Sequence, residues 1–338
     1  MKPFALVLES MCALSTLVLM LSGAAAPGPE PIGKLVDLGG HRLHVNCTGH
    51  GSPTVVVETG LGDFSFDWAL VQTRVSGFAR ICTYDRAGYA WSDPGPKPRT
   101  FAQVNLELHD ALRKLGEKGP FVLVGHSYGG PVMRNFATVY RSDAAGLVLV
   151  DSAHEGLRVG VGGKNTIQLG VNVPFRDIPA PRENLLASDK PELPPDQLPP
   201  PQPLEAIYKN LPAADQSLHL WAQNLLEVED AENSQREWSD QSFARWLADP
   251  HSASLGNLPL IVLTRLEGGY TQDLDVPAAQ MEQERKEGQE KLARLSSNSE
   301  QIFVNSGHNM ELEAPEDVTA VIRRMVEAVR QGRPIGKK

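Results

Sequence analysis

The sequence has few cysteines, no stripe of basic residues and no spacing of histidines or cysteines typical of a metal site. Of its 338 residues, 3 are Cys, 32 are Lys or Arg and 41 are Asp or Glu, so the formal net charge at pH 7 is −9. The absence of clustered positive charge to neutralise phosphates argues against nucleic acid as the main partner. Without a metal-binding spacing, we expect no metal and no other cofactor.

One long apolar run is present, at the N-terminus. Lys2 precedes an apolar stretch from Met11 to Leu21, and three alanines at positions 24–26 precede a Pro/Gly break. This layout over residues 1–26 is typical of a secretory signal peptide. The run is short for a spanning helix, so an uncleaved membrane anchor is the alternative. We expect a secreted or periplasmic protein with no stable membrane insertion once the signal is removed.

Two cysteines, Cys47 and Cys82, lie outside this segment. Two thiols in an exported protein suggest one disulfide. Two small buried hydrophobic residues on strands are the alternative. Export favours the disulfide.

Short apolar segments alternate with helical patterns on either side of a polar, proline-rich stretch. Strands are expected in a hairpin at Gly39-Gly40 and at residues 54–60, 79–88, 121–125, 146–151 and 258–264, with "QIFVN" the last. This alternation indicates a parallel sheet covered on both faces. From about residue 154 to 256 it stops, and two helices are expected, at 213–229 and 233–247. Apolar residues at helical spacing there favour an insertion that packs over the sheet, although a disordered linker would explain the proline run.

The octapeptide "LVGHSYGG" contains the pattern G-x-S-x-G, formed by Gly125, Ser127 and Gly129. An apolar run precedes it and a helical pattern follows, so a buried strand is expected to turn into a helix at the serine. The apex of such a turn has a strained backbone, and only residues without a Cβ fit two positions to either side. The pattern predicts a nucleophile elbow with Ser127 at its apex.

Five motifs occur in an order and spacing typical of one family: "VVVETGLG", "YDRAGYAWSDPGP", "GHSYGG", "LVLVD" and "SGHNMELEAPEDV". Together they resemble the α/β-hydrolase fold family, in the branch that includes haloalkane dehalogenases, epoxide hydrolases and small serine esterases. The resemblance runs from Gly33 to the end, except for the insertion. It implies a mostly parallel central sheet flanked by helices, with a helical lid. The expected parts are the signal peptide (1–26), the core (27–154 and 256–338) and the lid (155–255).

The resemblance implies a Ser–His–acid triad. A serine is a poor nucleophile until a base takes its proton, and the family order of serine, acid and histidine leaves His154, His219, His251 and His308 as candidate bases. His308 follows the last strand in a Gly-containing loop from which its ring could reach back over the sheet edge, so it is the expected base. His219, on an amphipathic helix, and His251, in a linker, are expected to be exposed.

The sequence offers more than one candidate for the acid of the triad. In the family it follows either the sixth or the seventh strand. After the seventh strand the chain reads "TRLEGGYTQDLD", without the usual Gly-x-x-Asp, and offers Glu267 and Asp273. Asp151 directly follows "GLVLV", where some relatives carry their acid and others only a structural aspartate. We expect Asp151 to complete the triad, with Glu267 as the main alternative.

The resemblance also implies an oxyanion hole made by the backbone N–H groups of Leu61 and Tyr128. Gly60 and Gly62 would keep the backbone around Leu61 unobstructed. In "YDRAGYAWSD", Asp85, Arg86 and Gly88 are expected to form a structural corner. In the family's sheet order the second and fourth strands are neighbours, so Cys47 and Cys82 could lie side by side.

The family's dehalogenases and epoxide hydrolases use an aspartate nucleophile, whereas Ser127 would form an acyl-enzyme. We therefore expect a serine hydrolase that acts on a small-molecule acyl substrate, in the manner of a carboxylesterase. An acyltransferase or a peptidase would use the same groups. The alternative of another class is a ligand-binding receptor or carrier on a hydrolase scaffold with little turnover.

Overall fold

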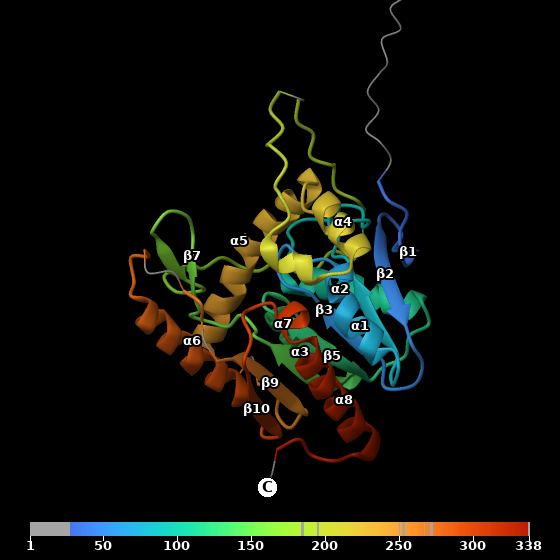
Figure 1. Ribbon diagram of the computed structural model, residues 1–338, viewed down its shortest axis with the longest axis vertical. Coiled ribbons are helices and arrows are strands. Elements are labelled where there is room, and N and C mark those ends of the chain that lie inside the picture. Colours follow the sequence, from blue (N-terminus) through green and yellow to red (C-terminus); the bar gives the residue numbers. More distant parts are fainter. Residues whose placement is uncertain are drawn as a thin grey trace, which may run out of the picture. The chain divides into compact units, whose positions relative to one another are not determined.

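The alternating segments form one eight-stranded sheet (Figure 1). The computed structural model describes residues 28–183, 186–194, 196–249, 251, 254–266, 268–270 and 273–336. The strands follow the order β1-β2-β4-β3-β5-β6-β9-β10, and every pair from β4 to β10 is parallel, while β2 pairs antiparallel with β1 and β4. The expected mostly parallel α/β-hydrolase sheet is therefore confirmed.

The strands of this sheet are β1 (Lys34–Asp37), β2 (Arg42–Thr48), β3 (Val55–Glu58), β4 (Ile81–Tyr84), β5 (Phe121–His126), β6 (Ala144–Val150), β9 (Leu260–Arg265) and β10 (Ser299–Val304). A separate hairpin comprises β7 (Arg158–Gly160) and β8 (Thr166–Gln168). The α-helices are α1 (Ala69–Val75), α2 (Phe101–Lys114), α3 (Gly129–Val139), α4 (Ala213–Ala222), α5 (Leu226–Ala248), α6 (Ala278–Ala293), α7 (Met310–Glu313) and α8 (Pro315–Gln331). Short 3₁₀ helices are η1 (Ser65–Trp68), η2 (Arg141–Asp143) and η3 (Ala206–Asn210).

The chain divides into two units, Met1–Glu30 and Pro31–Lys338, and all the elements above belong to the second. The predicted signal peptide, residues 1–26, lies outside the described residues. Among the described helices, none has both the length and the apolar character needed to cross a membrane.

Both faces of the sheet are covered, because the central strands are apolar on both sides. Alternate residues such as Leu123 and Leu149 pack against α2, α3 and α6, whereas Val124 and Val150 pack against α1 and α8. α8 has its apolar face on the sheet and ends at Gly332, whose φ of 59° suits a glycine C-cap. These layers leave the carboxyl ends of the parallel strands as the edge available for a site.

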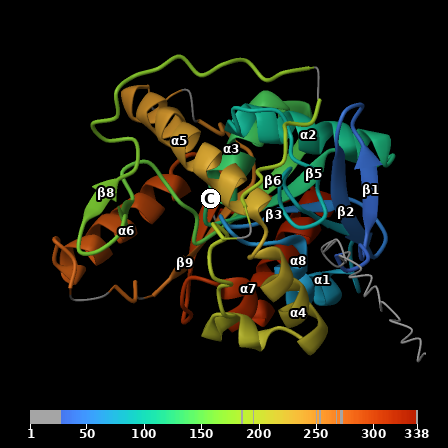
Figure 2. The same ribbon diagram turned by 90° about the horizontal axis from the view of Figure 1, so that it is seen from above.

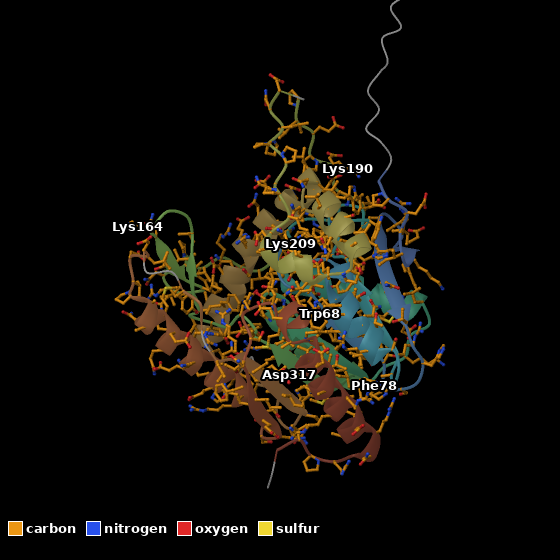
Figure 3. The ribbon with its side chains drawn as sticks, in the orientation of Figure 1. Trp68, Phe78, Lys164, Lys190, Lys209 and Asp317 are labelled. Atoms are coloured by element: carbon orange, nitrogen blue, oxygen red, sulfur yellow. A yellow bond between two sulfur atoms is a disulfide. The ribbon has the colours of Figure 1, made fainter. Side chains whose placement is uncertain are left out.

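Residues between β6 and β9 form the β7–β8 hairpin, η3, α4 and α5. The hairpin lies beside α6, and α5 lies beside α2 (Figure 2). Lys164 is at the tip of the hairpin and Lys209 is on η3 (Figure 3). The existence of two helices was predicted correctly, but their bounds were wrong: the extended backbone at Leu225 separates them, and α5 begins seven residues before residue 233. The division into core and lid at residues 155–255 stays a prediction.

Cys47 and Cys82 are directly opposite each other in the antiparallel β2–β4 pair. Their predicted proximity is therefore confirmed, and a disulfide joins them across a sequence separation of 35 residues. The bond links the antiparallel edge of the sheet to its parallel part.

We expect the Cys47→Ser/Cys82→Ser variant to lose roughly 3–4 kcal/mol of unfolding free energy, because the cross-link restricts the unfolded chain. Urea denaturation of the oxidised wild type and of the variant measures this loss. Thiol titration of unreduced, denatured protein from a periplasmic expression host is the control. Two titratable thiols at positions 47 and 82 in that sample would contradict the disulfide.

Candidate active site

Ser127 occupies the sharp turn between β5 and α3, with a φ of 48°. Its N–H donates to the Val150 carbonyl at 3.1 Å, so the turn is tied to the end of β6. A Cβ at Gly129 would overlap the Glu58 carbonyl, and one at Gly130 would overlap the Ser152 hydroxyl. The expected strained elbow, with space only for glycine after the serine, is present.

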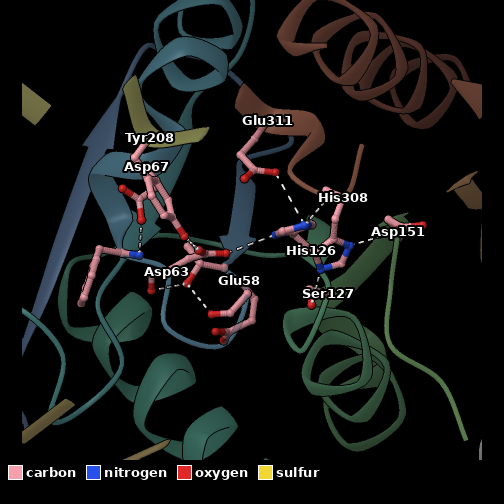
Figure 4. Close-up of polar contacts among 12 residues, drawn as sticks. Glu58, Asp63, Asp67, His126, Ser127, Asp151, Tyr208, His308 and Glu311 are labelled. Atoms are coloured by element: carbon pink, nitrogen blue, oxygen red, sulfur yellow. Dashed lines mark hydrogen bonds and ion pairs between the residues drawn. The ribbon is translucent and has the colours of Figure 1, made fainter. Parts of the chain in front are cut away.

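His308 and Asp151 join Ser127 in one hydrogen-bonded chain (Figure 4). His308 Nε2 is 2.9 Å from Ser127 Oγ, and His308 Nδ1 is 2.6 Å from Asp151 Oδ2. Asp151 directly follows β6, and His308 lies in the loop after β10. The structure thus brings together the three residues expected to form the triad, although 157 residues separate Asp151 from His308. Of the other candidate acids, Asp273 is exposed and Glu267 lies outside the described residues.

Asp151 is 5% exposed, and its carboxylate faces two guanidinium groups. Arg265 Nη1 is 3.1 Å from Oδ2 and Arg285 Nη1 is 3.6 Å from Oδ1. Burial by itself would raise the pKa of Asp151, but the hydrogen bond with His308 and the neighbouring positive charges outweigh it and hold the pKa below its usual value. Asp151 is therefore ionised at neutral pH.

Sequence reasoning missed both arginines. Arg265 ends β9, which is the sheet neighbour of β6, so its strand-end position was a usable signal. Arg285 comes from α6, where a charged surface pattern gives no indication that this side chain is buried.

The His308 ring is partly exposed, with 41% of its side chain accessible. Partial burial of the ring lowers the pKa of His308 below the ordinary value, and the charges of His126 and Arg265 lower it further. The hydrogen bond with Asp151 acts in the opposite direction but does not outweigh them. The ring is consequently neutral at pH 7. In that state Nδ1–H donates to Asp151 and Nε2 accepts from the Ser127 hydroxyl, which is the arrangement a general base requires.

A cavity of about 810 Å³ opens onto Ser127 and His308. Leu61 and Tyr128 line it beside the serine. Most of the remaining wall is apolar, and its larger members are Leu157, Val159, Val161, Ile167, Leu169, Phe243, Leu274 and Met281. The volume and lining suit a small organic ligand.

Leu61 lies in the turn after β3, in a position fixed by its neighbours. A Cβ at Gly60 would overlap the Asp63 carboxylate, and Gly62 has a φ of 82°. Within the described part of the chain, the N–H groups of Leu61 and Tyr128 make no hydrogen bond to another residue. Both amides are therefore available to an acceptor, and their role as an oxyanion hole stays a prediction.

The corner at residues 85–88 is structural, as expected, and it also supports this turn. Arg86 Nη1 is 2.6 Å from the buried Glu58 carboxylate, and its Nη2 donates to the Gly60 carbonyl at 2.6 Å. Asp85 accepts hydrogen bonds from Ser65 N and the His44 ring. Arg86 therefore holds the residue that precedes Leu61.

The expectation that His219 is exposed is wrong. His219 is 2% exposed, and its ring donates from Nδ1 to Asp67 Oδ1 at 2.8 Å and stacks on Tyr208. Burial raises the pKa of Asp67 to about 6, against the effect of His219. Helical spacing alone could not show that this face of α4 packs against η1. His251 is exposed, as expected.

Two groups of side chains in the described residues are close enough to share a cation: Cys47, Cys82 and Glu117, and Asp63, His126 and Glu311. The disulfide occupies both cysteines of the first group. In the second group, His126 Nε2 donates to the His308 carbonyl at 2.9 Å, and Nδ1 is 3.3 Å from an Asp63 oxygen. The second group is therefore an ion-pair cluster in which the ring faces an acceptor on each side.

Comparison with known proteins agrees with this fold. A family model described as "Alpha/beta hydrolase family" matches residues 18–321. Over 129 residues the chain is 37% identical to "Probable transporter efuK" of Hormonema carpetanum, a match covering 36% of this chain. The chain spans 18% of the length of that relative.

Solved structures resemble most of the chain. A serine hydrolase involved in carbazole degradation, the CarC enzyme, is 17% identical with a TM-score of 0.59, over 88% of this chain and 98% of that one. A thermophilic esterase from Thermogutta terrifontis is 20% identical with a TM-score of 0.54, over 86% and 94%. At such identities the likeness shows the fold. Since the family model also covers most of the sequence, the chain belongs to the α/β hydrolase family.

Proposed function

We propose that this protein is a serine hydrolase that cleaves a carboxylic ester through Ser127, His308 and Asp151. The observation that carries the proposal is the hydrogen-bonded chain from Ser127 Oγ through the His308 ring to Asp151, in the wall of a cavity. A serine with an adjacent base, itself oriented by a carboxylate, is the arrangement that activates a hydroxyl for acyl transfer.

In the proposed reaction, His308 Nε2 takes the Ser127 proton as Oγ forms a bond to the ester carbonyl carbon. The carbonyl oxygen becomes an oxyanion, which the N–H groups of Leu61 and Tyr128 would stabilise. As the C–O bond breaks, His308 returns the proton to the leaving alcohol. A water then gives its proton to His308 and attacks the carbonyl carbon of the acyl-Ser127 ester. As the bond from that carbon to Ser127 Oγ breaks and the acid leaves, His308 returns this proton to Oγ. Asp151 stabilises the imidazolium in both steps.

The cavity favours an ester with an apolar group. Side chains of the β7–β8 hairpin and its flanks, among them Leu157, Val159 and Leu169, form part of its wall. Because these residues belong to the insertion at 155–255, we propose that the insertion acts as a lid that sets substrate preference. The similar protein from Thermogutta terrifontis is an esterase, which is consistent with this class of substrate.

We further propose that the protein is secreted or periplasmic. Two observations support this: the signal-like layout of residues 1–26, and the facing pair Cys47 and Cys82, since disulfides persist mainly in oxidising compartments.

The test is a panel of 4-nitrophenyl esters of increasing acyl length, combined with fluorophosphonate labelling and mass spectrometry of the labelled peptide. We expect saturable release of nitrophenol, one label at Ser127, and loss of turnover in proportion to labelling. Chains that reach the apolar wall should be preferred over acetate. A single burst of nitrophenol with a stable adduct would instead indicate a receptor or carrier, and transfer to an added alcohol in preference to water would indicate an acyltransferase.

A further inference from the structure

A buried group of ionisable side chains lies directly behind the triad, out of contact with the cavity. Asp63, His126 and Glu311, here called the His126 cluster, are each at most 5% exposed. His126 Nδ1 is 3.3 Å from Asp63 Oδ2, and Nε2 is 3.7 Å from Glu311 Oε2. Figure 4 shows the His126 ring between these carboxylates and the His308 ring.

His126 joins the three segments that carry the proposed catalytic groups. It precedes Ser127 at the end of β5, and its Nε2 donates to the backbone carbonyl of His308 at 2.9 Å. Asp63, on its other side, lies in the turn that contains Leu61 and donates its N–H to the Gly60 carbonyl. The nucleophile, the base and the proposed oxyanion turn are therefore linked through one ring.

The environment favours the doubly protonated ring. Burial would lower the pKa of His126, but Glu311 and Asp63 outweigh it and raise the pKa to about 9. Burial raises the pKa of Glu311, against the effect of His126. Burial would also raise the pKa of Asp63, but the contact with His126 and the hydrogen bond from Tyr208 hold it below its usual value, so Asp63 is an ionised counter-ion of the imidazolium at pH 7. Asp63 also accepts a hydrogen bond from Tyr208, which lies on η3 in the insertion.

We propose that His126 is a positioning residue: its imidazolium holds the main chain at His308 in place and keeps the His308 ring neutral. This inference rests on the proposed function, since it assigns His126 a role in setting the proposed base. The ring centroids of His126 and His308 are 4.8 Å apart, close enough for the charge of one to disfavour protonation of the other. His126 reaches no cavity-lining position, so it acts through His308 and not on the substrate.

Charged side chains face both rings. Asp151 and Arg265 flank His308, and Glu311 and Asp63 flank His126. Loss of the His126 charge leaves the Asp63 carboxylate ionised, and this negative charge also favours protonation of His308. Without the nearby His126 cation, the pKa of His308 is therefore expected to rise.

Two substitutions separate position from charge. His126→Gln keeps an N–H donor for the His308 carbonyl but removes the charge, whereas His126→Ala removes both. We expect His126→Gln to shift the acid limb of kcat/KM towards higher pH by roughly one unit. We expect His126→Ala to show the same shift together with a loss of about 100-fold in kcat at little change in KM, which is the loss typical of a misplaced catalytic group.

His109→Gln is the matched control, because it alters a histidine that is paired with Asp143 away from the site. This variant should change neither the acid limb of kcat/KM nor kcat.

A second measurement does not depend on turnover. In Ser127→Ala protein, NMR titration of the histidine rings should show one ring, absent from His126→Gln, that carries protons on both nitrogens at pH 7 and titrates near pH 9. If His126→Gln folds poorly because Glu311 loses its partner, His126→Gln/Glu311→Gln removes both members of that pair and should show the same shift of the acid limb.

An unshifted acid limb in folded His126→Gln, or a His126 ring that is neutral at pH 7, would overturn the inference. A failure of the proposed function would give a different result, because the wild-type protein would then show no turnover that depends on Ser127. The NMR arm would still decide whether His126 is charged and whether it lowers the pKa of His308.

Discussion

Replacing Ser127 by alanine is expected to lower ester turnover by about four to six orders of magnitude, the range seen when a triad nucleophile is removed. Without Oγ no acyl-enzyme forms, and only binding and the oxyanion donors remain. Folding should persist, because alanine keeps the Cβ that already occupies this strained turn, and the only side-chain hydrogen bond lost among the described residues is that to His308. Single-turnover kinetics and a thermal melt measure the two effects.

A matched set of variants tests whether the groups act as a unit. His308→Ala should be about as damaging as Ser127→Ala, and the double variant no worse than either, because a triad without one member gains nothing from the others. All three should lose fluorophosphonate labelling. A Ser127→Ala protein that retains half of the wild-type rate would eliminate the proposed mechanism.

Asp151→Asn is expected to lower turnover by at least about a thousand-fold. The carboxylate accepts Nδ1–H of His308 at 2.6 Å, and an amide nitrogen turned to that position would favour the wrong tautomer. The amide also leaves Arg265 without a counter-ion at 3.1 Å, so some loss of stability should accompany the loss of rate. Measurement of kcat/KM together with urea denaturation separates these effects.

Asp273→Asn is the matched control, since its carboxylate is exposed, and Glu267→Gln tests the alternative acid. Each should lower turnover by less than about ten-fold, well below the effect of losing a triad acid. If Glu267→Gln were the crippling change and Asp151→Asn were mild, Asp151 would be a strand-end anchor for the two arginines, and the acid would follow β9.

Local chemistry accounts for what sequence reasoning predicted well. The strands were recognisable because their apolar runs are buried on both faces, and α8 because its apolar residues recur at helical spacing. Ser127 was identifiable because an elbow admits only glycine at Gly129, a steric demand visible in the sequence. The helix ends in the insertion could not be predicted from the sequence, because no proline or glycine lies at the break between the helices at Leu225.

The sequence by itself determined the parallel sheet and the elbow at Ser127, because periodicity and backbone sterics act over a few residues. The expected base, His308, came from the triad order that the resemblance to the family implies. Only the tertiary structure decided which groups surround them. Asp151 meets His308 across 157 residues, Arg285 reaches Asp151 from α6, and His219 turns inward onto Asp67. Such pairings depend on how strand ends and packed helices orient individual side chains. The charge of each side chain depends in turn on its burial. A local sequence pattern contains neither kind of information.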